Sequence, residues 1–301
     1  MSRRVAAIDV GTNSTRLLVA DIAGGSIAEV ERLLRITRLG DRVDASGELA
    51  EASMRRVLEC VAGYAARARE LTAERPLLVA TSAVRDAGNG GEFLRRLEGE
   101  CGVRTRLLTG EQEAGMTLRG VASSRKADGP FVVCDIGGGS TELVAGDGDR
   151  VGFAVSLDMG CVRMSERHLA SDPPAPAELA ALRAEVAAML PDGVPRDELV
   201  GVAGTVTTLA TIDLGLEHEQ PELIDGHVVS AATVEAQLAR LAALSLAERR
   251  EVQGLMPERA PTIVAGTAIL AELLARLGHD RLTVSERDIL HGAALEAAAS
   301  A

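Results

Sequence analysis

Two stretches of this chain carry residues whose types and spacing suit phosphate chemistry. "AAIDVGTNSTRLLVAD" and "VVCDIGGGSTELVAGD" share an apolar run, an Asp, a Gly-containing turn, a Ser-Thr pair and a second apolar run. With Asp135 laid over Asp9, an offset of 126 residues, the other matched pairs are Gly11/Gly137, Ser14/Ser140, Thr15/Thr141, Leu17/Leu143 and Asp21/Asp147. A unit that occurs twice in this way indicates an internal duplication.

The chemistry of such a turn follows from its backbone. A Gly-, Ser- and Thr-rich turn between two strands directs several backbone N–H groups to one point, and such a nest binds phosphate oxygens. Glycine lacks a Cβ, so the ligand can approach closely. Asp9 or Asp135 would be repelled by phosphate but can hold a divalent cation that the phosphate also contacts. Two such units facing each other across a cleft would form a phosphate clamp, although one copy alone would be weak evidence because Gly-Ser hairpins are common.

A third stretch fits the same chemistry. "VGVAGTVTTLAT" reads as an apolar strand that runs into Gly204 and Thr205 and then into a helix. A Gly-Thr turn at a helix N-terminus is an anion site. The alternative is an ordinary strand-to-helix turn with Thr as the capping residue.

Composition limits the possible functions. The 301 residues are 47% hydrophobic but only 1% aromatic, which predicts aliphatic cores and argues against stacking on single-stranded nucleic acid. The net charge is −12, yet Arg32, Arg35, Arg38 and Arg42 cluster early, either as a solvated face or as a guide for a small polyanion. The four cysteines show no CxxC pairing and no His at metal-ligand spacing, which fits a reduced, cytoplasmic protein.

Targeting signals are not expected. The N-terminal residues are too few and too polar for the apolar region of a signal peptide. The longest apolar candidate, "PTIVAGTAILAELLARL", contains Glu272 and Arg276, so it is predicted to be a core helix and not a membrane span.

The elements that must position these residues alternate between strand and helix, which predicts an α/β fold. A hairpin is expected at 4–22 and a further strand at 25–40, followed by a long amphipathic helix at 48–73. A buried strand "PLLVATSAV" ending at Arg85, a helix around 90–98, a strand at 103–109 and a helix opening at Thr109 come next. After a strand, turn and strand at 131–146, helical patterns occur near 176–190, 204–212, 231–244, 262–277 and 285–299. The predicted domains are 1–124 and 125–301, with the last helix able to pack back on the first domain.

With these motifs the chain closely resembles the exopolyphosphatase / guanosine pentaphosphate phosphohydrolase (Ppx/GppA) family of the acetate kinase–sugar kinase–Hsp70–actin superfamily. The motifs that carry the resemblance are "AIDVGTNSTRLLVAD", "ATSAVRDAGN", "LLTGEQEAGMTLRGV", "VCDIGGGSTELV", "SLDMGCVRMSERHL", "VAGTVTTLA" and "PERAPTIVAGTAIL". They cover nearly the whole chain. The resemblance implies two actin-like (ribonuclease H-like) α/β domains flanking a central cleft.

The resemblance also implies residue roles. Glu113 falls on the family's water-activating Glu; the residues themselves predict only a helix start, with Thr109 and Gln112 forming a capping box. The resemblance likewise implies that Arg85 binds phosphate. The alternative is that Arg85 is a surface residue that forms an ion pair with Asp86 or Glu92. The other positions that the resemblance implies to bind metal or phosphate are Asp9, Asn13, Ser14, Asp135, Gly137, Gly138, Gly139 and Ser140. Gly204 and Thr205, the Gly-Thr turn described above, are added to them as candidate phosphate-binding residues.

The predicted function is therefore an exopolyphosphatase that releases terminal orthophosphate, with Mg²⁺ or another divalent cation bound by Asp135 and Asp9. The alternatives are a pppGpp 5'-phosphohydrolase, a small-molecule kinase of the same superfamily, and a non-catalytic polyphosphate or alarmone sensor. The substrate is expected to be polyphosphate or pppGpp, without nucleic-acid or membrane partners, and the family resemblance suggests a homodimer. The chain departs from the family pattern at Gly115, where an Arg is common, and at Leu290 and His291, where a charged pair is common.

Overall fold

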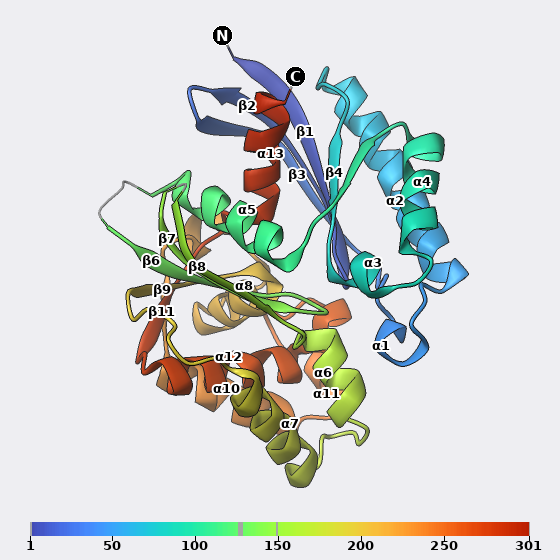
Figure 1. The fold of residues 1–301 in the computed structure, drawn as a ribbon. Helices are drawn as coiled ribbons and strands as arrows, with labels where there is room; N and C mark the ends of the chain where they lie inside the picture. The colour runs from blue at the N-terminus through green and yellow to red at the C-terminus, as the bar shows by residue number, and fades with distance from the viewer. Residues whose placement is uncertain (1, 126–128, 149, 301) are drawn as a thin grey trace. The chain divides into compact units, whose positions relative to one another are not determined.

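The computed structural model describes residues 2–125, 129–148 and 150–300 (Figure 1). The chain divides into two compact units: unit 1 comprises Met1–Ala127 and Arg287–Ala301, and unit 2 comprises Asp128–Glu286. Each unit is built on one mixed β-sheet with helices packed against it, so the predicted α/β class is confirmed. Among the described residues, none of the helices combines the length and apolarity that crossing a bilayer requires.

The sheet of unit 1 has five strands in the order β3-β2-β1-β4-β5. Strands β1 (Arg3–Val10), β2 (Ser14–Ala23) and β3 (Ser26–Ile36) form an antiparallel meander, as the expected hairpin and its continuation required. Strands β4 (Leu77–Ala80) and β5 (Arg104–Leu107) add in parallel to β1. The meander therefore places its first turn, 11–14, at the carboxyl end of β1.

The strands of unit 1 bury side chains on both faces of the sheet. In β1, Ala6, Ile8 and Val10 pack with helices α2 (Glu51–Glu70) and α4 (Gly90–Cys101), whereas Val5 and Ala7 pack on the opposite face. That opposite face is covered by α13 (Ile289–Ala299), which lies beside α5 (Gly110–Ala122) in Figure 1. Because side chains alternate along a strand, Asp9 faces the α13 side. Two short helices, α1 (Val43–Ser46) and α3 (Ser82–Asp86), complete the unit.

The sheet of unit 2 has six strands in the order β10-β11-β9-β6-β7-β8. Strands β6 (Phe131–Ile136), β7 (Thr141–Asp147) and β8 (Arg150–Leu157) repeat the antiparallel meander, and β9 (Glu198–Val202) pairs in parallel with β6. β11 (Arg281–Val284) lies next to β9, and β10 (Val228–Ser230) forms the edge.

One face of this second sheet carries the main core of unit 2. Val132, Cys134 and Ile136, which alternate along β6, belong to an aliphatic core that also contains residues of the long helix α12. All four cysteines of the chain are buried and free. The helices of the unit are α6 (Cys161–His168), α7 (Pro176–Met189), α8 (Ala203–Asp213), α9 (Pro221–Ile224), α10 (Ala231–Ala243), α11 (Leu246–Arg250), the 3₁₀ turn η1 (Pro257–Arg259) and α12 (Ile263–Leu277).

Two expectations about local structure need correction. The strand expected to end at Arg85 ends at Ala80, and Arg85 lies in the short helix α3. The helix expected to follow Gly204 and Thr205 begins at Ala203, so both residues lie in its first turn. Short apolar runs do not distinguish strand from helix by period, which explains the first error, and the second is a shift of one residue in a helix boundary, the least reliable feature to read from sequence.

Candidate active site

The two repeated turns have the same backbone geometry. The Gly11 N–H donates to the Ser14 carbonyl at 3.0 Å, and the Gly137 N–H donates to the Ser140 carbonyl at 3.0 Å. In both meanders the last paired residues flank a four-residue turn, Gly11–Ser14 in unit 1 and Gly137–Ser140 in unit 2. The sequence repeat is therefore also a repeat of structure.

The residues paired across the strands next to these turns differ between the repeats. In unit 1, Asp9 lies opposite Arg16; at the matching place in unit 2, Asp135 lies opposite Glu142. Directly opposed residues of antiparallel strands have Cβ atoms about 4.5–5.5 Å apart, so each pair brings two side chains together. The duplication thus has an acid–base pair in one copy and two carboxylates in the other.

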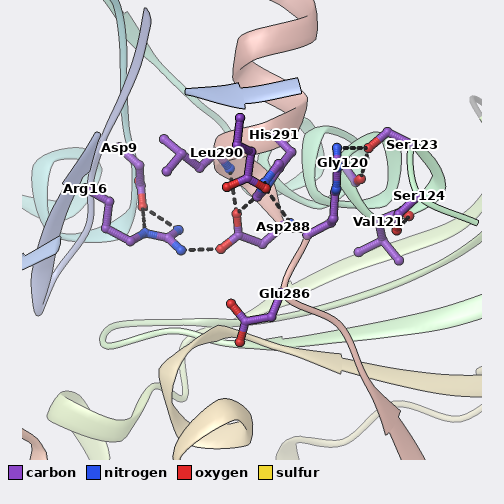
Figure 2. A network of polar contacts seen from close by, with 12 residues as sticks. Asp9, Arg16, Gly120, Val121, Ser123, Ser124, Glu286, Asp288, Leu290 and His291 are labelled. Atoms are coloured by element: carbon purple, nitrogen blue, oxygen red, sulfur yellow. Dashed lines mark hydrogen bonds and ion pairs between the residues drawn. The ribbon is translucent and has the colours of Figure 1, made fainter. Parts of the chain in front are cut away.

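Arg16 of unit 1 is shared between two buried carboxylates (Figure 2). Its Nε and Nη2 donate to Asp9 Oδ2 at 3.0 and 2.7 Å, and its Nη1 donates to Asp288, the N-cap residue of α13. Burial raises the pKa of Asp9, and Arg16 opposes that rise. For Asp288, burial would also raise the pKa, but Arg16 and His291 lower it well below its usual range.

His291 continues the same network. It is completely buried, its Nε2 lies 3.0 Å from Glu29 Oε1, and its Nδ1 lies 3.4 Å from Asp288 Oδ1. Burial would lower the pKa of His291, but the hydrogen bonds and charges of Asp288 and Glu29 raise it. Leu290 and His291, the two residues that differ from the family pattern, are thus buried at the start of α13.

The structure brings together two residues that the sequence assigned separately. Arg85 Nη1 donates to Glu113 Oε2 at 3.1 Å and to the Leu108 carbonyl at 3.0 Å. Glu113 is buried in the first turns of α5, where Thr109 and Gln112 form the predicted capping box. The alternative partner of Arg85, Asp86, is at 3.8 Å. Arg85 therefore holds a buried carboxylate at the start of a helix.

Glu142 is a candidate that sequence reasoning missed. It is 1% exposed, and the Ser156 hydroxyl donates to its Oε1 at 2.6 Å; Asp135 opposite it is 8% exposed. Both lie on the sheet face opposite the main core of unit 2, since their strand neighbours Cys134 and Leu143 face that core. A Glu at the start of an otherwise apolar strand, "TELVAG", was the available signal.

These two carboxylates fit a divalent cation. Mg²⁺ is commonly bound by one or two carboxylates, with water and substrate phosphates as the other ligands. The described parts of the chain contain no group of three or more His, Cys, Asp or Glu side chains arranged as a complete metal cage. The donor set around Asp135 and Glu142 thus suits a cation that the substrate also binds.

The N-terminus of α8 has an unusual backbone. Ala203 adopts a positive φ of 68°, a region that costs a non-glycine residue about 1–2 kcal/mol, and α8 has no side-chain cap. Gly204 lies directly against the guanidinium of Arg259, because a Cβ there would be 1.5 Å from Nη1. A Cβ on Gly266 would lie 2.3 Å from Thr205 Oγ1, so the Thr205 hydroxyl faces α12 and only its backbone amide suits an anion.

Glu111, three histidines and two methionines lie outside these groups. Glu111 is exposed. His168 and His227 form surface pairs with Glu185 and Asp213, at 2.7 and 2.8 Å, and His218 is exposed. Met159 and Met164 are both completely buried.

Each of the two sheets carries a glycine-containing turn with buried carboxylates beside it. This combination is typical of an α/β protein that binds phosphate groups. Comparison with known proteins defines the family. Residues 18–301 match the model of the Ppx/GppA phosphatase family, and the chain belongs to it. The predicted family is therefore confirmed.

Individual relatives cover nearly the whole chain. Exopolyphosphatase 2 of Mycobacterium tuberculosis is 38% identical over 315 aligned residues, with 98% of each chain covered. Guanosine-5'-triphosphate,3'-diphosphate pyrophosphatase of Vibrio atlanticus is 30% identical, covering 97% of this chain but 58% of its own length. The solved Ppx/GppA enzyme of Aquifex aeolicus has a TM-score of 0.82 at 33% identity, covering 97% of this chain and 98% of its own.

Proposed function

We propose that this chain is an exopolyphosphatase that releases terminal orthophosphate from inorganic polyphosphate by attack of water. The observation that carries the proposal is the buried Glu113 at the start of α5, held by Arg85. The exopolyphosphatase relative, which is similar over 98% of its length, supports the choice of substrate.

Glu113 is proposed as the general base. Phosphoryl transfer requires little covalent work from the protein: water must be positioned in line, charge must be neutralised and a proton must be accepted. Arg85 Nη1 lies 3.1 Å from Glu113 Oε2 and orients this carboxylate, and a carboxylate is a group that can accept a proton from water. The guanidinium of Arg85 has a fork of donors that suits a terminal phosphate as well.

Backbone amides are proposed to bind the phosphoryl oxygens. The candidates are the turns Gly137–Ser140 and Gly11–Ser14, with Asn13 and Ser14 in the latter, and the first turn of α8 at Gly204 and Thr205. Preorganised N–H donors of this kind replace solvent around developing charge without reorganising during the reaction. Arg259, against Gly204, adds a positive charge beside the α8 turn.

Asp135 and Glu142 are the residues proposed to hold Mg²⁺ or another divalent cation, which when bound would neutralise charge on the phosphoryl oxygens. Asp9 is kept as a ligand only through Oδ1, because Arg16 already donates two hydrogen bonds to Oδ2. A homodimer, which the family resemblance suggests, and a cytoplasmic location, which the cysteine pattern suggests, are further proposals, and light scattering after gel filtration tests the first.

Hydrolysis of pppGpp is the second candidate function, because a relative with that printed activity is 30% identical over 97% of this chain. An assay of phosphate release across tripolyphosphate, long-chain polyphosphate, pppGpp and ATP, with and without Mg²⁺, separates the candidates. The proposal expects Mg²⁺-dependent release from a polyphosphate at the highest kcat/KM. Faster release from pppGpp would favour the second function, and phosphate transfer from ATP to an added acceptor would favour a kinase. Binding of polyphosphate without any release would indicate a sensor.

A further inference from the structure

The carbonyl groups of Gly137, Gly138 and Gly139 in the second glycine-containing turn are directed to one side by a neighbouring segment, Gly160–Arg163. The N–H of Cys161 donates to the Gly137 carbonyl at 2.9 Å, and the N–H groups of Val162 and Arg163 donate to the Gly138 carbonyl at 2.9 and 3.2 Å. The side chain of Arg163 completes the series, because its Nε donates to the Gly139 carbonyl at 2.8 Å.

The direction of the amides follows from these bonds. In a planar trans peptide, the C=O of one residue and the N–H of the next point in opposite directions. With the carbonyls of Gly137, Gly138 and Gly139 facing the segment, the N–H groups of Gly138, Gly139 and Ser140 face away from it. Three successive amides are thereby aimed to one side, as an anion nest requires.

Unit 1 has a related arrangement, in which backbone N–H groups hold two carbonyls of its turn. The N–H of Gly40 donates to the Thr12 carbonyl at 2.8 Å, and those of Thr37 and Arg38 donate to the Asn13 carbonyl at 3.0 and 2.9 Å. In both units the donating segment follows the third strand of the meander, directly after β3 in unit 1 and after two intervening residues from the end of β8 in unit 2. The N–H groups of Asn13 and Ser14 are therefore turned away from the segment 37–40.

Close packing requires glycine in each segment. A Cβ on Gly160 would lie 2.3 Å from the carbonyl carbon and oxygen of Gly138, and a Cβ on Gly40 would lie 2.2 Å from Thr12 Cγ2. Thr12 and Gly138 are matched positions of the repeat. A buried residue precedes each glycine, Leu39 in unit 1 and Met159 in unit 2, both 0% exposed. The duplication thus includes an apolar-Gly element that the sequence comparison did not align.

We propose that Gly160 and Arg163 are positioning residues for phosphate binding: they hold the Gly137, Gly138 and Gly139 carbonyls so that the amides of Gly138, Gly139 and Ser140 face the substrate, and Gly40 has the corresponding role in the first turn. This inference rests on the proposed function. Arg163 acts in it through its Nε hydrogen bond to the backbone and not through its charge on the substrate.

Paired substitutions at Arg163 test that distinction. Gln has its side-chain amide nitrogen at the same number of bonds from Cα as the Nε of Arg, so Arg163→Gln keeps a donor and removes the charge, whereas Arg163→Met removes both. Since misplacing a reacting group by about 1 Å can cost about 100-fold, Arg163→Met is expected to lower kcat/KM for polyphosphate by about 10- to 100-fold, in both kcat and KM. Arg163→Gln is expected to recover most of that loss.

Controls accompany the pair. Arg167→Met changes an arginine of the same helix that pairs with Glu185, and it is expected to leave kcat/KM unchanged. Gly160→Ala is expected to lose at least as much activity as Arg163→Met, whereas Gly152→Ala, whose Cβ would meet only the Ala145 carbonyl at 3.7 Å, is expected to behave as wild type. Thermal unfolding of every variant identifies those that do not fold.

Calorimetric titration with tripolyphosphate keeps this test separate from that of the proposed function. If the wild type binds tripolyphosphate but releases no phosphate, the proposed function fails, and the binding constants of the Arg163 variants still decide the positioning role. Weaker binding by Arg163→Met with recovery by Arg163→Gln supports the proposal. The proposal is overturned if Arg163→Gln is as impaired as Arg163→Met, if Arg163→Met equals wild type, or if the wild type does not bind tripolyphosphate.

Discussion

Replacement of Arg16 by Met should destabilise the protein strongly. Arg16 has a side chain that is only 13% exposed, and it compensates two carboxylates whose side chains are 7% and 5% exposed, Asp9 and Asp288. Arg16→Met leaves both carboxylates in a buried environment with their shared cation removed. Breaking a buried ion pair by removing one partner costs about 3–5 kcal/mol.

The expected change is large enough to measure by urea unfolding and by thermal unfolding. At roughly 2–4 °C per kcal/mol for a unit of this size, the unfolding temperature should fall by about 6–20 °C. Arg67→Met is the matched control, because Arg67 is 42% exposed and its pairs with Glu31 and Glu70 are worth at most about 1 kcal/mol.

A second substitution identifies the cause. Asp288→Asn keeps a side-chain oxygen for the N-cap bond to the Leu290 N–H but removes one of the two charges. The double variant Arg16→Met/Asp288→Asn should therefore be more stable than Arg16→Met alone. If Arg16→Met unfolds within about 1 kcal/mol of wild type, or if Asp288→Asn does not improve it, the electrostatic explanation of this network is refuted.

Three further predictions concern the metal, a buried histidine and helix packing. Glu142→Gln should weaken the Mg²⁺ dependence of phosphate release, raising the Mg²⁺ concentration for half-maximal activity at least about tenfold, whereas the exposed Glu235→Gln should not change it. His291 lies between Asp288 and Glu29, near Arg32, and its pKa is raised in the folded protein. Its protonation therefore stabilises the folded state fully below the pKa of about 6.5 that His has in the unfolded chain, and this stabilisation is lost as pH rises through the pKa of the folded state. Unfolding temperature should thus fall less between pH 6 and 9 in His291→Gln than in wild type or in the exposed-site control His218→Gln; equal slopes would contradict this. Gly120→Ala should cost about 1–3 kcal/mol, because its Cβ would lie 1.8 Å from the Asp288 carbonyl oxygen, whereas Gly63→Ala in α2 meets open space; equal stability of the two variants would show that α5 and α13 can separate freely.

Local patterns predicted much of the fold. The first two strands of each meander are apolar runs on either side of a glycine-containing turn, α2 has a clear period of 3.6 residues, and the capping box at Thr109 marks the start of α5, so these elements could be read directly. The short strands β10 and β11 have no such signal. Their three or four residues pair with partners distant in the chain, and that pairing depends on tertiary contacts.

The candidate site was only partly accessible from sequence. The turn residues and Glu113 come from a repeat and a family resemblance, but the ion pair of Arg16 with Asp288 joins residues that are 272 positions apart. The strand register that sets Asp135 opposite Glu142 likewise becomes visible only once the turn is known to have four residues. The hydrogen bonds of the segment 160–163 to the turn carbonyls depend on backbone direction, which residue types alone do not specify.

The role of Glu113 is tested most directly by comparing phosphate release from polyphosphate by wild type and Glu113→Gln, with binding of tripolyphosphate measured in parallel. Loss of a general base should lower kcat by about 10²–10⁴-fold while binding persists. Glu111→Gln, two residues earlier on the exposed side of α5, should retain full activity. Normal turnover by Glu113→Gln would contradict the proposed mechanism.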